Sequence, residues 1–106
     1  MSNNVHEFER RIESEPPRFS FVLFVAGASS RSLRAVQNAK AACEELLAGR
    51  YELEIVDIYK NPAAARDEQI VAVPTLLRKL PAPLRQVIGD LSVRQRLVAS
   101  MGMAAA

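Results

Sequence analysis

The chain has few of the residues that carry redox or metal chemistry. It contains one cysteine, one histidine and no tryptophan in 106 residues. A single cysteine cannot form an internal disulfide, which is typical of proteins from a reducing compartment. Structural and catalytic metal sites need several Cys, His or carboxylate ligands, and the sequence has no Cys/His cluster. The sequence therefore excludes a disulfide-stabilised fold and predicts neither a metal nor another cofactor.

Long apolar runs and a strong net charge are also missing. No apolar run approaches the ~20 residues that span a bilayer. Residues 1–18 are polar and of mixed charge, unlike a secretory signal. The net charge of +2 is too small to indicate nucleic-acid binding by itself. We therefore expect a cytoplasmic protein that binds neither membrane nor nucleic acid.

Length and composition predict one folded domain with an appended segment at each end. An apolar content of 49% in 106 residues suits a single core. Residues 1–17 have few apolar side chains, close with two prolines and contain the only histidine, His6, for which no catalytic partners are evident. We expect a flexible appendage over residues 1–17, the domain over 18–102 and a tail over 103–106.

The first half of the chain predicts a strand, a helix and a second strand. Phe19–Val25 is almost entirely β-branched and aromatic, which is typical of a strand buried on both faces. Gly27 permits a sharp turn after it, and Ser30 or Ser32 can cap the helix that follows. Gly49 is positioned for a left-handed helix end. The helix shows an apolar stripe at spacings of three and four: Leu33, Val36, Ala39, Cys43, Leu46 and Leu47.

The second half predicts a short helix, a hairpin and a final helix. After a second strand over residues 51–58, Asn61-Pro62 is a strong helix start, and that helix should run to about Ile70. Two apolar runs, 75–80 and 84–88, flank Pro81 and Pro83 and predict a hairpin. Ser92, with a glutamine three residues later, forms a capping-box pattern before a helix over about 93–101.

The order β-α-β-α-β-β-α is that of a thioredoxin-like domain. In such a domain Pro74 enters the third strand, and we expect its peptide bond to be cis; the alternative is a proline that merely ends the preceding segment. The position of the reactive cysteines, however, is Ala26–Ser32 and has no thiol. Cys43 lies on the apolar stripe and is interpreted as a buried structural residue. The segment also lacks the glycine patterns of nucleotide-binding loops. The sequence therefore favours binding over catalysis.

Charge is distributed unevenly along the chain. Seven acidic residues and three basic ones lie between Glu44 and Glu68, whereas five basic residues and one acidic one lie between Arg78 and Arg96. This asymmetry suits a protein partner of opposite charge, although ordinary solvated faces give the same pattern. The cations next to apolar segments serve either solubility or docking on an acidic partner, and the candidates are Arg34, Lys60, Arg78 and Arg85.

Several strings of residues resemble a known family. Lys60-Asn61-Pro62, then Pro74-Thr75-Leu76, then Leu80-Pro81-Ala82-Pro83, then Ile88-Gly89-Asp90-Leu91-Ser92 follow one another in the order found in KaiB, the small clock protein of cyanobacteria. The resemblance covers residues 18–101. The sensor domain of the associated histidine kinase is a related module, but the strings fit KaiB better.

The resemblance implies a regulator that is not an enzyme. KaiB binds the ring-shaped ATPase KaiC and, in cyanobacteria, helps to sequester KaiA. The family is metamorphic: the part after Pro74 packs either in a tetramer-forming ground state, β-α-β-β-α-α-β, or as a thioredoxin-like monomer that binds KaiC. The residues expected to shape this switch are Gly27, Asn61, Pro62, Pro74, Pro81, Pro83, Gly89 and Asp90.

The final segment indicates which packing this chain prefers. Residues 96–101 contain one β-branched residue among alanine, leucine and methionine, which favours a helix. We therefore expect the thioredoxin-like state. The chain lacks the acidic tail of typical KaiB sequences, which leaves open a KaiA partner, a tetramer or dimer, and a circadian or a stress role. The alternative functions are a sensor or adaptor module that docks on a histidine kinase or stress-signalling partner, and a thioredoxin-like enzyme, which lacks its thiol.

Overall fold

The computed structural model describes residues 18–102, so the predictions for residues 1–17, His6 and 103–106 lie outside the described part. The elements are β1 (Phe19–Val25), α2 (Ser30–Leu47), β2 (Tyr51–Asp57), α3 (Pro62–Asp67), β3 (Thr75–Leu80), β4 (Arg85–Ile88) and α4 (Arg94–Ser100). This is the predicted β-α-β-α-β-β-α order of a thioredoxin-like domain and not the alternative order.

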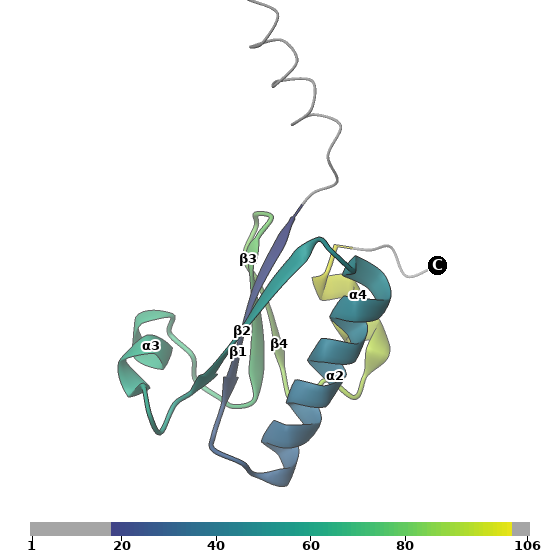
Figure 1. Ribbon diagram of the computed structural model, residues 1–106. Helices are drawn as coiled ribbons and strands as arrows, with labels where there is room; N and C mark the ends of the chain where they lie inside the picture. Colours follow the sequence, from purple (N-terminus) through teal and green to yellow (C-terminus); the bar gives the residue numbers. More distant parts are fainter. Residues whose placement is uncertain (1–17, 103–106) are drawn as a thin grey trace, which may run out of the picture.

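The sheet has the strand order β2-β1-β3-β4. Strand β1 pairs in parallel with β2 and antiparallel with β3, and β3 pairs antiparallel with β4. Helices α2 and α4 cover one face, and α3 lies on the other side of the sheet (Figure 1).

Strand β1 is buried on both faces, as its unbroken apolar run predicts. Phe21 and Leu23 belong to the core beneath α2 and α4, whereas Val22 and Phe24 belong to the smaller core beside α3. This alternation follows from the period of two along a strand. The central strand therefore carries both layers of the domain.

The N-cap of helix α2 lies one residue before the first predicted cap. Ser29, and neither Ser30 nor Ser32, is the N-cap, and its Oγ accepts a hydrogen bond from the Ser32 backbone N–H at 3.2 Å. The predicted stripe is correct except at Leu33, whose side chain is 52% exposed. The face that meets the sheet instead includes small residues, because the helix approaches closely there: Ser32, Ala35, Ala39 and Ala42.

Helix α3 confirms its predicted start and is shorter than predicted. Asn61 accepts from the backbone N–H of Ala64 at 3.2 Å, and Pro62 is the first helical residue. The helix ends at Asp67, not near Ile70, because Gln69 adopts a left-handed backbone with φ 57°.

The C-terminal half, defined here as residues 75–102, forms the predicted hairpin and helix. The Val73–Pro74 peptide bond is cis as predicted, as are the bonds before Pro81 and Pro83. The capping-box prediction is wrong: the Ser92 N–H donates to the Asp90 carboxylate, and α4 begins with Val93 as its N-cap and no side-chain cap. Leu97 of this helix and Met101 at its C-terminal end are buried in the core shared with α2.

Candidate partner-docking surface

The junction between β1 and α2, where a thioredoxin-like reductase carries its thiols, is closed by serines. The Ser32 side chain is buried, and its Oγ accepts from the Ala26 N–H at 3.1 Å and from the Ser29 hydroxyl at 2.9 Å. Gly27, with φ +60°, donates its N–H to the Asp57 carboxylate at 3.0 Å. Because these polar groups bond one another, the junction is a hydrogen-bonded turn, and it has no thiol.

Cys43 is buried, as predicted, in the middle of α2. Burial and the neighbouring Glu44 carboxylate raise the pKa of its thiol to about 11. A thiol with this pKa is almost entirely protonated at neutral pH and therefore unreactive. Within residues 18–102, no cluster of His, Cys, Asp and Glu could hold a metal ion. Cys43 is part of the hydrophobic core.

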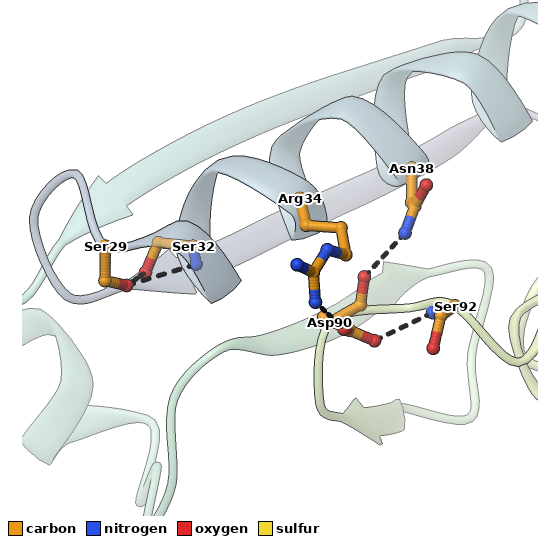
Figure 2. A network of polar contacts seen from close by, with 6 residues as sticks. All are labelled: Ser29, Ser32, Arg34, Asn38, Asp90 and Ser92. Atoms are coloured by element: carbon orange, nitrogen blue, oxygen red, sulfur yellow. Dashed lines mark hydrogen bonds and ion pairs between the residues drawn. The ribbon is translucent and has the colours of Figure 1, made fainter.

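Asp90 joins the C-terminal half to α2, as Figure 2 shows. Its carboxylate accepts from Arg34 Nη1 at 3.0 Å and from the Ser92 N–H at 3.1 Å, and its carbonyl accepts from Asn38 Nδ2 at 2.8 Å. The hydrogen bonds from Ser92 and from Arg34 lower the pKa of Asp90 to about 2. The Asp90 carboxylate is therefore charged at any physiological pH and keeps its hydrogen bonds to Arg34 and to the Ser92 N–H.

A second polar contact joins α2 to the start of α4. Arg94 pairs with Glu45 at 2.9 Å, with both side chains more than half exposed. Between the two contacts is a groove lined partly by Ala41, Ala42 and Leu91. The outer rim of the α2–α4 contact is therefore polar, while Leu97 and Met101 fill its inner side.

Four more of the residues predicted to shape the switch lie around the hairpin and its entry: Pro74, Pro81, Pro83 and Gly89. Gly89 has φ +117° and donates its N–H to the Pro74 carbonyl at 2.8 Å, which ties the end of β4 to the start of β3. Pro81 and Pro83 lie in the turn between these strands. Their role in switching stays a prediction.

The four cations predicted for partner docking do not form one face. Arg34 is on α2 and paired with Asp90, and exposed Lys60 follows β2. Exposed Arg85 is on β4. Because β2 and β4 are the two opposite edges of the sheet, Lys60 and Arg85 are separated by its width. The sequence could not reveal this, since strand order is set by long-range pairing.

Arg78 is the clearest departure from the expected exposed face. It is only 5% exposed, and its Nη2 donates to the Pro83 carbonyl at 2.8 Å. It lies on the same side of β3 as Leu76, two residues earlier, which belongs to the core beneath α2 and α4. The prediction placed Arg78 on an exposed docking face, but the structure buries its guanidinium.

The uneven charge along the sequence gives the sheet one edge strand with exposed acidic residues and one with an exposed arginine. Glu52 and Glu54 are exposed on edge strand β2, whereas Arg85 on edge strand β4 lies across a cavity from Arg96 of α4. Arg31 and Arg96 also line a neighbouring pocket. Neither Arg31 nor Arg96 was singled out from the sequence. The block of basic residues that ends at Arg96 was a sufficient signal for Arg96.

Comparison with known proteins identifies the family. Residues 22–103 match the family model of the KaiB domain. The chain belongs to the KaiB family. It is 41% identical over 81 residues to the circadian clock oscillator protein KaiB of Microcystis aeruginosa, a match that covers 76% of this chain and 78% of that one. It is 38% identical over 89 residues to KaiB of Synechococcus elongatus, covering 82% and 87%.

Solved structures confirm the thioredoxin-like fold of this KaiB-family chain. The N-terminal domain of Synechococcus elongatus SasA matches with a TM-score of 0.68 at 18% identity, covering 88% of this chain and 91% of that one. The germline-specific thioredoxin Deadhead of Drosophila melanogaster matches with a TM-score of 0.66 at 14% identity, covering 92% and 91%. In the described residues, no helix is long and apolar enough to cross a membrane.

Proposed function

We propose that this protein is a clock-type regulator that binds a KaiC-type ATPase ring in the thioredoxin-like packing described above. The observation that carries the proposal is membership of a family of circadian clock proteins in a chain whose strand–helix junction has no thiol. Binding, and not catalysis, is then the activity that this scaffold can supply.

Refolding of the C-terminal half gates this binding. Only the fraction of molecules in the competent packing docks, so the apparent affinity falls with that fraction. The polar contacts of Asp90 and the burial of Leu97 favour the thioredoxin-like packing over a tetramer-forming or dimer-forming ground state. The exposed cations Lys60 and Arg85 meet acidic groups of the ring, one at each edge of the sheet.

The test mixes the purified protein with the KaiC homologue of the same genome and ATP, and follows co-elution by size-exclusion chromatography over hours. Arg85→Glu and Lys60→Glu should each weaken co-elution, whereas Arg66→Glu on α3 is the matched control for charge reversal. If wild-type protein fails to co-elute at every temperature tried, the proposal is wrong. If the wild type and all three variants co-elute equally, the ring-binding proposal stands, but the roles assigned to Lys60 and Arg85 are wrong.

A second candidate is a sensor or adaptor module that docks on a histidine kinase or stress-signalling partner. The likeness in fold to the N-terminal domain of SasA supports it. A pull-down from lysate with the wild-type protein, analysed for kinases as well as for ring ATPases, separates the two. Recovery of a kinase without the ring ATPase favours this second function.

A further inference from the structure

Arg78 is a buried cation without a counter-charge in the described part of the chain. Within residues 18–102, its Nε has no hydrogen-bond partner, and none of the three ion pairs includes it. The hydrogen bond that its side chain makes among these residues, to the Pro83 carbonyl, involves a neutral acceptor. Buried charges in proteins are normally paired, because removing an ion from water without compensation is costly. The described residues therefore supply no counter-charge for this guanidinium.

A second arginine lies directly beside it. Arg85 is the cross-strand partner of Arg78, so both side chains leave the same face of the hairpin. This is the face of α4, because Val87, two residues along β4, belongs to the core beneath that helix. Burial and repulsion by Arg85 both lower the pKa of Arg78. The repulsion makes an anion at this place more favourable still.

The guanidinium of Arg78 reaches the end of α4. A Cβ added at Gly102 would lie 3.0 Å from Arg78 Nη1, so the glycine leaves room for this group. Arg85, the cross-strand partner of Arg78, lines a cavity of about 280 Å³ between β4 and α4, together with Gln86, Val87, Arg96, Ala99 and Ser100. No carboxylate is among these residues, and the two arginines face the cavity from opposite elements.

We propose that Arg78, Arg85 and Arg96 form a binding site for a phosphate oxyanion. Arginine presents several N–H donors in a fixed fork that matches phosphate and carboxylate oxygens. A phosphate carries about 1.5 to 2 negative charges at neutral pH and offsets more of the three positive charges than a carboxylate does. The site shares Arg85 with the proposed ring-docking cations, but its test needs no ring partner, so the two proposals can fail separately.

The test measures thermal unfolding in sodium phosphate, sodium acetate and sodium chloride at equal ionic strength and pH 7.5. Phosphate also stabilises folded proteins non-specifically, so the comparison between variants decides. Arg85→Gln and Arg96→Gln are exposed substitutions, and Arg66→Gln on α3, across the sheet, is the matched control. We expect a phosphate-dependent rise in Tm for wild type and Arg66→Gln. The apparent affinity should fall about tenfold or more in each of the other two.

The Tm of Arg78→Met in the two salts is an independent test, because a variant that folds poorly would be less stable than the wild type in both. In chloride this variant should unfold at the same temperature as wild type or higher, since replacing a buried unpaired charge by an apolar side chain is neutral or stabilising. In phosphate the Tm of both proteins should show the non-specific rise, but that of the wild type should rise further, so the order of the two proteins reverses.

Three results would overturn the proposal. The first is an equal rise in Tm for wild type and for the Arg85→Gln, Arg96→Gln double variant in phosphate. The second is an effect of acetate as large as that of phosphate. The third is a strongly destabilised Arg78→Met in chloride, because it would mean that the guanidinium already has a partner in the protein.

Discussion

Replacing Leu97 by alanine tests the packing of α4 on the sheet. Leu97 is 3% exposed, so almost its whole side chain is removed from water. The substitution deletes three carbon atoms, worth about 0.8 kcal/mol each, and the remaining cavity adds to this, which gives a loss of about 3 kcal/mol. If this loss falls on the thioredoxin-like packing alone, the ratio of that packing to any alternative falls about a hundredfold.

The assay combines urea unfolding followed by circular dichroism with an amide NMR spectrum of the folded protein. The control is Leu47→Ala, an equally buried leucine on α2, which belongs to the half that both proposed packings share. Both variants should lose similar stability, but only Leu97→Ala should show new amide signals in the C-terminal half. A loss below about 1 kcal/mol for Leu97→Ala would mean that this leucine is not buried in solution, which would refute the reasoning.

Three further outcomes follow from the described contacts. The lowered pKa of Asp90, about 2, means that the wild type loses the associated stability as the pH falls from about 4 to about 2. Asp90→Asn should therefore be less stable at pH 7 and show a flatter dependence of Tm on pH in that window; identical pH profiles would contradict this. Gly27→Ala should lower the free energy of unfolding by about 1–2 kcal/mol, because φ is +60° and the new Cβ would lie 3.3 Å from the Tyr59 ring. Urea unfolding measures this loss, and unchanged stability would exclude the left-handed turn. Cys43, with its pKa raised to about 11, should react with Ellman's reagent at pH 8 only in denaturant, and rapid reaction of the native protein would exclude its burial.

Local signals in the sequence were sufficient for most of the fold. The unbroken run of β1, Gly27 after it and Asn61-Pro62 before α3 each depend on near neighbours, and the structure confirms them. The capping box failed because Asp90, two residues before Ser92, binds the Ser92 N–H itself. The helix stripe erred at Leu33 because small residues, and not the largest apolar ones, face the sheet at that end of α2.

The candidate surface was harder to predict, because it depends on which strands become neighbours. Lys60 and Arg85 look equivalent in sequence, yet the strand order places them at opposite edges. Arg78 reads as a surface cation, and only the hairpin register and the position of α4 reveal that it is buried beside Arg85. The role of Asp90 was predicted from a family string, but its contacts with α2 span more than 50 residues and leave no local pattern.

The secondary structure of residues 94–100 in the ring-bound protein tests most directly whether the thioredoxin-like packing is the state that docks. Isotope-labelled protein bound to the KaiC-type ATPase ring with ATP should show helical carbon chemical shifts over Arg94–Ser100, as in α4. Extended shifts over this segment in the complex would contradict the claim.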